Sequence, residues 1–434
     1  MLIQPQNKIA IIGGHVFDPA QGLDEALDIF IENDIIVALG LAPQGFDAMA
    51  TIDATGKMIF PGFIDLNAFL GEPGFSQKGN IATETEAAAR SGITTICSTP
   101  NSQPVVDSAT LAHLIQDKAQ QAGFCNVLPV GALTAGLKGE QLSNMYALKE
   151  AGCVALSNLD SPFKDTRVAQ QCYHYAAGFD IRVFVTPLDT ALAHGGCMHE
   201  GPTSTQLGLA GIPLSAETAS LAQHLILCEE TGINLHISRI TSARTLQMIL
   251  DAQQRNLPVT ADVALGNLIF TDENCQAYDS LQHVTPAYRS QADREALLNA
   301  VNQGQISICS NHRPHELAAK MAPFAATEAG ISVLDSFTNA LLGLVKSDQL
   351  TLKSAIQAVT ASPAKVIGHK VMGASLGQLT IESQADLCIV DMNAQTCLES
   401  DNLKSKGHNN PWLGQALPGK VVCTINRGHI VYQA

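Results

Sequence analysis

Residues 58–74 read MIFPGFIDLNAFLGEPG, and this stretch decides the fold. Its first half, 58–65, is an apolar run that predicts a short strand buried on both faces. Its second half is a loop rich in Gly and Pro. Strands with two buried faces are typical of parallel sheets, in which helices cover both sides. The stretch therefore predicts the first strand-and-helix unit of an α/β protein.

The same unit recurs along the middle of the chain, where short apolar runs alternate with helical stretches. Parallel βα units follow from such alternation. Eight of them predict a closed (β/α)8 barrel of the TIM type, with a doubly wound open sheet as the competing topology. The expected strands are 58–65, 93–98, 126–130, 154–157, 182–186, 234–238, 259–263 and 306–310, and the expected helices are 83–90, 109–121, 141–150, 168–177, 216–230, 243–255 and 293–302.

Both ends of the chain have a different pattern, with short β-branched runs and no long amphipathic helix. Residues 8–13 and a hairpin at 27–40 are the clearest strands at the start, and 385–391, 421–426 and 429–432 are those at the end. We expect 1–57 and 371–434 to pair into one small β-sandwich domain, which the barrel at 58–370 interrupts in sequence.

Composition narrows the class of protein. Hydrophobic residues make up 46% and charged residues 15%, which is typical of a globular chain with a large core. The net charge of -15 and the lack of a Lys/Arg cluster argue against a nucleic-acid partner. Eleven Cys without a CxxC pair predict free thiols in a reducing cytoplasm. The N-terminus lacks the pattern of a signal peptide, and no apolar run reaches the roughly 18 residues of a membrane span.

In a barrel, functional residues follow the carboxyl ends of the strands, and there the chain resembles a known family. The loop PGFIDLNAFLGEPG at 61–74 resembles the PGFIDxHxHxREPG motif of the dihydroorotase family of amidohydrolases. TPNSQP at 99–104 resembles the family's TPNTxP, SNHRPH at 310–315 its TDHAPH, and SKGHNNPW at 405–412 its SKGxNTPF. The resemblance keeps order and spacing over nearly the whole chain.

The departures from these motifs fall on the residues that carry the family's chemistry. The resemblance implies two metal-binding His and a substrate-gripping Arg after the first strand. It also implies a bridging acid after the fourth strand, a His after each of the fifth and sixth, and an Asp after the eighth that is both ligand and general base. These seven positions hold Asn67, Phe69, Gly71, Asn158, Pro187, Arg239 and Asn311.

These replacements remove the requirements of a hydrolytic zinc site. Such a site needs at least three imidazole or carboxylate ligands and an open position for water. Phe69 and Pro187 offer no ligand atom, and Arg239 is a permanent cation that repels a metal. Asn311 cannot accept a proton, so the general base is missing too. We expect no catalytic residue, no bound metal and no other cofactor, although the family uses zinc.

Four polar residues remain from the family's pocket: Asp65, Asn101, His312 and His315. Asn101 matches a substrate-contacting Asn of the family. One alternative is an active zinc-dependent cyclic-amide hydrolase whose shifted metal site uses Asp65, His236, His312 and His315. Another is a sensor that binds a pyrimidine intermediate through Asn101 and His315.

The family also contains non-catalytic members that assemble with the catalytic chain of aspartate transcarbamoylase, the preceding enzyme of pyrimidine biosynthesis. The resemblance implies that this chain is one of these inactive homologues. It would act as a structural subunit, as a homodimer within a larger hetero-oligomer.

Overall fold

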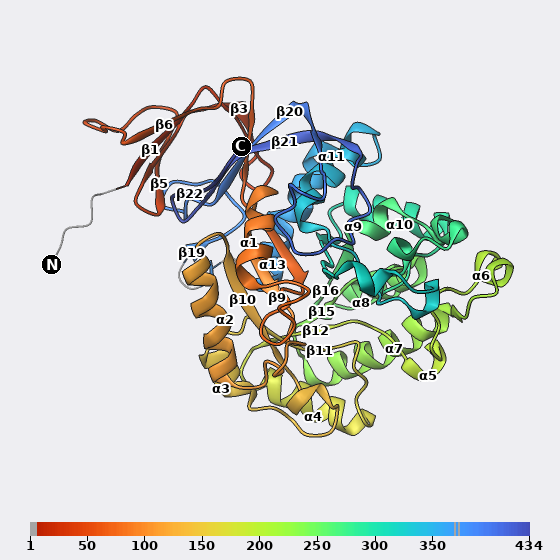
Figure 1. The fold of residues 1–434 in the computed structure, drawn as a ribbon. Coiled ribbons are helices and arrows are strands. Elements are labelled where there is room, and N and C mark those ends of the chain that lie inside the picture. The colour runs from red at the N-terminus through yellow and green to blue at the C-terminus, as the bar shows by residue number, and fades with distance from the viewer. Residues whose placement is uncertain (1–6, 369, 372–373) are drawn as a thin grey trace.

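A computed structural model describes residues 7–368, 370–371 and 374–434, and its centre is an eight-stranded parallel sheet of order β17-β16-β15-β12-β11-β10-β9-β8. The two end strands also meet, because Ala68 and His312 form a parallel bridge and the Ser310 N–H donates to Asp65 at 2.8 Å. The sheet is therefore a nearly closed barrel, which confirms the predicted fold (Figure 1). Its strands are β8 (Phe63–Ala68), β9 (Ile93–Ser98), β10 (Asn126–Ala132), β11 (Ala155–Leu159), β12 (Arg182–Val185), β15 (Leu235–Ile237), β16 (Val259–Ala264) and β17 (Ser307–Cys309).

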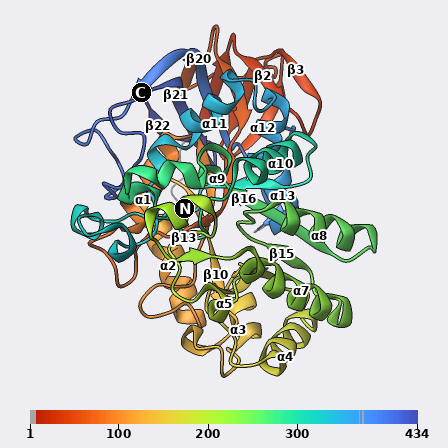
Figure 2. The same cartoon turned by 90° about the vertical axis from the view of Figure 1, so that its right-hand side faces the viewer.

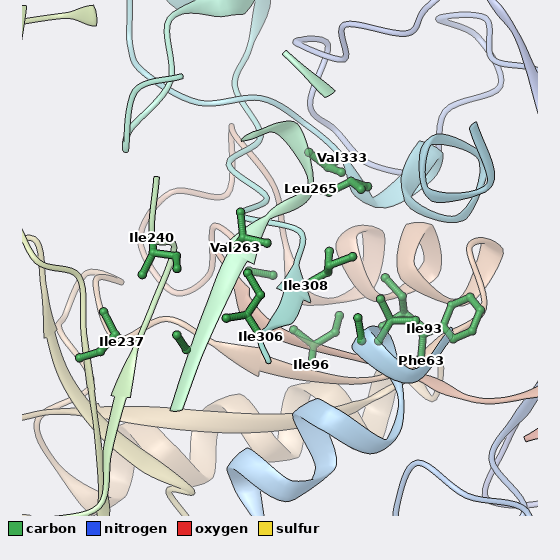
Figure 3. Close-up of a cluster of buried hydrophobic side chains, with 14 of the residues drawn as sticks. Phe63, Ile93, Ile96, Ile237, Ile240, Val263, Leu265, Ile306, Ile308 and Val333 are labelled. Atoms are coloured by element: carbon green, nitrogen blue, oxygen red, sulfur yellow. The ribbon is translucent and has the colours of Figure 1, made fainter. Parts of the chain in front are cut away.

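Helices surround the barrel, and in Figure 2 α4, α7, α8 and α10 follow one another along its side. Apolar side chains on the outer face of the wall pack beneath them; Figure 3 shows Ile96, Val263 and Ile308 in this layer. The helices are α1 (Ile81–Arg90), α2 (Ala109–Ala122), α3 (Met145–Glu150), α4 (Thr166–Ala177), α5 (Thr190–Ala193), α6 (Pro202–Leu207), α7 (Leu214–Thr231), α8 (Ala243–Gln254), α9 (Leu265–Ile269), α10 (Gln291–Asn302), α11 (Phe337–Lys346), α12 (Leu352–Val359) and α13 (Ala361–Ile367).

The barrel interior holds a second, smaller apolar cluster. Leu66, Cys97, Leu128 and Phe184 point inward from four strands and fill the space between them. Alternation between this cluster and the outer layer follows from the two-residue period of a strand. The barrel is thus packed through its centre, which leaves its chemistry to the loops at the strand ends.

Strands from both ends of the chain share one sheet, as expected. The six-stranded sheet has the order β22-β21-β20-β7-β2-β3, and a four-stranded sheet of order β5-β4-β1-β6 accompanies it (Figure 1). Ile11, Ile31, Ile59 and Ile389 are among the side chains buried in the core of these strands. The strands are β1 (Lys8–Ile12), β2 (His15–Asp18), β3 (Leu23–Ala26), β4 (Ile29–Glu32), β5 (Ile35–Leu39), β6 (Ala50–Asp53), β7 (Met58–Pro61), β20 (Leu387–Cys397), β21 (Ala416–Asn426) and β22 (His429–Gln433); two short pairs lie elsewhere, β13 (Met198–His199) with β14 (Gly211–Ile212) and β18 (Lys370–Val371) with β19 (Ala374–Ser375).

The expected first strand, 58–65, is two strands in the structure. β7 pairs with β2 and β20, whereas the first barrel strand begins at Phe63. Gly62 lies between them, and a Cβ atom there would stand 2.2 Å from the Thr94 hydroxyl. Only Gly fits against Thr94 at the point where the chain passes from one sheet to the other, and the continuous apolar run does not reveal this change of sheet.

No helix in the described part of the chain is long and apolar enough to cross a membrane. All eleven cysteines lie in that part as free thiols, and only Cys397 is exposed.

Candidate functional site at the barrel mouth

Arg239 lies at the centre of the barrel mouth, directly after β15. Its side chain is among the largest that are fully buried, with 1% of its surface exposed. The guanidinium donates to Asn311 Oδ1 at 3.0 Å and to the hydroxyl of Thr186, while its Nε has no partner. The structure therefore joins two predicted positions, Arg239 and Asn311, through a direct hydrogen bond.

The backbone turns sharply at both of these residues. Arg239 has a φ of 58° and Asn311 a φ of 49°, in the left-handed region that residues other than Gly seldom adopt. The Arg239 N–H donates to Asp262 Oδ1 at 2.6 Å, and Asn311 Nδ2 donates to the Thr285 carbonyl at 3.1 Å. These contacts hold the two side chains toward each other across the mouth.

The charge of Arg239 has no carboxylate within salt-bridge distance among the described residues. Burial lowers its pKa, as does the guanidinium of Arg313, and Asp160 and Asp262 raise it in part. A fixed cation in this position repels a divalent metal electrostatically. The centre of the mouth is thus occupied by the type of charge that a metal would supply.

The loop after β8 has also closed over the position of the family's substrate-gripping Arg. Gly71 has a φ of 75°, and a Cβ atom added there would stand 2.4 Å from the Gly79 carbonyl oxygen. An Arg side chain therefore cannot be added without moving the loop. Phe69, two residues earlier, packs its ring against Phe75 with the centroids 5.8 Å apart.

The remaining replaced positions are spread around the mouth. Asn67 is buried and donates its N–H to Asp65 at 3.2 Å, and Pro187 lines a small cavity with Arg239. Asn158 does not join this group: its Oδ1 accepts from the N–H and the hydroxyl of Thr134, at 3.2 and 2.8 Å. Six of the seven positions therefore belong to the mouth and its first loop, and Asn158 faces the neighbouring β10 loop.

His312 is committed to a structural role. Its Nδ1 accepts from the Val333 N–H at 3.0 Å, so its Nε2 carries the proton and donates to Glu84 at 2.8 Å. Both His312 and Glu84 are fully buried. The imidazole has no free lone pair for a ligand.

His315 and His236 are also held by protein groups. His315 Nε2 donates to the Ala329 carbonyl at 3.1 Å, and burial lowers the pKa of His315 to about 4. His236 bonds Asp262 at 2.8 Å and Thr260 at 2.9 Å. The two histidines of the HxxH motif, His312 and His315, therefore bond to different partners and do not face a common site.

Asp65 lies below the mouth and ties the first strand to the last. It accepts from the N–H and the hydroxyl of Ser310 and from the Asn67 N–H. Burial raises the pKa of Asp65 to about 6 against these hydrogen bonds.

Zinc does not fit the donors that are present. Across residues 7–368, 370–371 and 374–434, no three His, Cys, Asp or Glu side chains converge as a metal would require. The four residues of the alternative metal site, Asp65, His236, His312 and His315, each bond separate partners as described. The structure therefore does not bring that site together.

Asn101 lines a cavity of about 380 Å³ at the outer edge of the mouth, together with Phe69, Lys78, Arg313 and His315. Its Oδ1 is buried and has no hydrogen-bond partner. The structure thus places two of the predicted remnants, Asn101 and His315, around one space. Lys78 and Arg313 went unpredicted, because no motif marks a loop Lys or Arg as lining the mouth.

This barrel, with its two-sheet companion and its polar residues at the strand ends, has the architecture of the amidohydrolases. The amidohydrolase family model matches residues 182–431, and the dihydro-orotase-like model matches residues 56–245. The chain belongs to the amidohydrolase family and, within it, to the dihydroorotase-like group.

Relatives and solved structures match this chain over nearly its full length. The chain is 45% identical to a dihydroorotase-like protein of Pseudomonas aeruginosa, over 98% of this chain and 99% of the relative. It is 35% identical to a dihydroorotase of Pelobacter propionicus, again over 98% and 99%. The structure of an L-hydantoinase (dihydropyrimidinase) from Arthrobacter aurescens matches with a TM-score of 0.87 at 20% identity, over 98% of this chain and 96% of that one, a likeness of fold.

Proposed function

We propose that this chain is a catalytically inactive dihydroorotase homologue that serves as a structural subunit. The observation that carries the proposal is the Arg239 guanidinium, buried at the centre of the mouth and bonded to Asn311 where the family places a metal ligand beside a general base. Neither residue can activate a water molecule, because one is a fixed cation and the other cannot accept a proton.

The loop after β8 supports the same conclusion independently. The closed turn at Gly71 excludes an Arg side chain, so the family's grip on the substrate is missing as well as its metal ligands. The frame around the mouth is intact, with His312 on Glu84 and Asp65 on Ser310. A frame kept without its chemistry favours a role that depends on the shape of the protein.

The partner in this proposal is the catalytic chain of aspartate transcarbamoylase. The support is the resemblance to non-catalytic family members that assemble with that chain, together with the relatives' name, dihydroorotase-like protein. The subunit would act in pyrimidine biosynthesis in the cytoplasm, as a homodimer within a larger complex that keeps the transcarbamoylase active.

Two measurements on the purified protein test the loss of chemistry. We expect less than stoichiometric zinc by elemental analysis and no ring closure or opening with dihydroorotate and its open-chain precursor. The Pelobacter propionicus relative, named a dihydroorotase, is the positive control. Stoichiometric zinc together with turnover would establish the active hydrolase instead.

A separate experiment tests the partner. The chain is mixed with the aspartate transcarbamoylase catalytic chain of its own organism and passed over a sizing column with light scattering. We expect one complex larger than either protein and a transcarbamoylase activity that rises when the complex forms. Two independent peaks at every protein and salt concentration would reject the assembly, while leaving the loss of hydrolysis untouched.

A further inference from the structure

Three loops on the carboxyl side of the barrel pack into one unit with an apolar cluster of its own, which we call the three-loop corner. In Figure 1 helix α6 of the first loop lies at the right-hand edge of the molecule. Cys197 and Met198 from the first loop, Cys275 from the second and Phe324 from the third are buried together. The corner is therefore a packed unit that projects from the barrel. Its loops are residues 196–212, 270–285 and 316–330.

The third loop exposes a run of apolar side chains. Of the ten residues 317–326, which read LAAKMAPFAA, only Lys320 is polar. Leu317 is 61% exposed and Met321 is 83% exposed. Exposed beside them are Ala318, Ala322 and Pro323. Single exposed apolar side chains are ordinary, but a contiguous group with a polar border marks an interaction site.

This apolar run is held in one conformation. The ammonium group of Lys320 donates to three backbone carbonyls, at 3.0, 3.2 and 2.6 Å; they belong to Ser280, His283 and Glu328. Phe324, 3% exposed, anchors the same loop in the apolar cluster. A partner that covers a surface fixed in this way has little conformational entropy to remove, which favours binding.

The border of the apolar run is acidic. Lys320 is the only Lys or Arg in the three loops, and Lys78 from the loop after β8 pairs with Glu328. Burial lowers the pKa of His283 to about 4 and lowers the pKa of His199 as well, so neither ring adds positive charge at neutral pH. The acidic side chains that reach the surface of the corner are Glu200, Glu273, Asp279, Glu316 and Glu328.

Charge decides which occupant fits this surface. A second copy of the chain, with its net charge of -15, would bring the same acidic borders together, and like charges that face each other across an interface cost energy. A groove with an apolar floor and Lys or Arg side chains along its edges matches both the centre and the border. We propose that the three-loop corner docks into such a groove on the aspartate transcarbamoylase catalytic chain, an inference that rests on the assembly role proposed above.

The affinity of the full-length chain for the purified transcarbamoylase catalytic chain, measured by biolayer interferometry, tests this surface. Leu317→Ser combined with Met321→Ser makes the centre of the surface polar. Leu41→Ser combined with Met49→Ser is the matched control, because these side chains are 89% and 65% exposed on the small β-domain and lie outside the corner. Melting temperatures check that each variant is folded.

We expect the Leu317 and Met321 double variant to bind the transcarbamoylase chain about tenfold more weakly or worse, since apolar anchors at the centre of an interface carry much of the affinity. The control should stay within about twofold of the parent, as surface positions outside an interface do. Glu200→Lys combined with Glu273→Lys should also weaken binding by about tenfold at low salt, and by less at high salt, because it reverses two charges at the border.

The possible outcomes separate this surface from the assembly role. Equal binding by the parent and the folded Leu317 and Met321 variant would overturn the docking surface and leave the assembly intact. If that variant keeps its affinity for the transcarbamoylase chain but loses self-association in light scattering, the occupant is a second copy and the proposal is wrong. No complex with the parent would overturn the assembly role and this inference with it.

Discussion

The centre of the barrel mouth, at Arg239, differs from two buried contacts beside it, His312 with Glu84 and Ser310 with Asp65, which together we call the ring. The difference lies in how their polar groups are satisfied. In the ring, Glu84 accepts from His312 at 2.8 Å and from the Lys406 N–H at 3.1 Å, and both His312 nitrogens are bonded. At the centre, Arg239 Nε and the Ser238 hydroxyl have no partner. Buried polar groups are normally paired. The difference indicates that the ring stabilises the fold, whereas the centre contains buried polar groups that no other group among the described residues satisfies.

The largest expected effect comes from breaking the ring at His312. His312→Leu removes the donor to Oε2 of the buried Glu84 carboxylate and leaves two N–H groups, of Val333 and Leu334, without their acceptor. We expect a loss of about 4 kcal/mol in the free energy of unfolding, measured by urea denaturation. His174→Leu is the control: that side chain is 56% exposed, and its change should cost less than about 0.5 kcal/mol. A similar small loss for both would show that the ring is not structural.

A second test of the ring uses pH at Asp65. Its pKa rises from 3.8 to about 6 on folding, so the folded chain keeps this proton longer than the unfolded chain does. The contribution of Asp65 to stability therefore falls as pH increases from about 4 to about 6 and levels off above. Asp65→Asn removes this contribution, and the difference in unfolding free energy between parent and variant should change by about 3 kcal/mol across that window. Stability curves that run parallel would contradict it.

How well the sequence predicts these two regions depends on how far apart in sequence the contacting residues lie. The barrel follows from the strand and helix periods, which are local. Arg239 and Asn311 were placed at the mouth because both follow barrel strands. The bond between Glu84 and His312 joins residues 228 positions apart, and no local pattern shows that Glu84 turns inward from α1.

Asn158 makes a contact that its motif position does not predict. Its motif position predicts a place among the emptied metal ligands. The pairing of β11 with β12 shifts register between Ser157 and Leu159, and Leu159 has a φ of 54°. An irregularity of this kind redirects side chains. The Asn158 amide therefore meets Thr134, a contact that depends on backbone geometry that the residue types do not reveal.

The closed conformation of the loop after β8 can be tested at Gly71. Gly71→Ala places a Cβ atom 2.4 Å from the Gly79 carbonyl oxygen, whereas Gly208→Ala, with a similar φ of 66°, meets nothing within 4 Å. We expect about 1 kcal/mol of destabilisation at Gly208 from backbone strain alone and about 2 kcal/mol more at Gly71 from the added clash. Urea denaturation of both variants measures the difference. Equal losses would mean that the loop is free to open, and that the Arg position is not closed.

The smallest expected effect is at the centre itself. Arg239→Met removes hydrogen bonds to Asn311 and Thr186, but it also removes a buried cation that has no carboxylate partner within salt-bridge distance among the described residues. Relief of the desolvation cost offsets the lost bonds, so we expect the unfolding free energy to change by no more than about 1 kcal/mol in either direction. Arg289→Met is the contrasting variant, because Arg289 is paired with the buried Glu217 at 3.1 Å and its loss leaves that carboxylate without its cationic partner. If Arg239→Met instead costs as much as Arg289→Met, the guanidinium is a structural substitute for the metal, and centre and ring are one network.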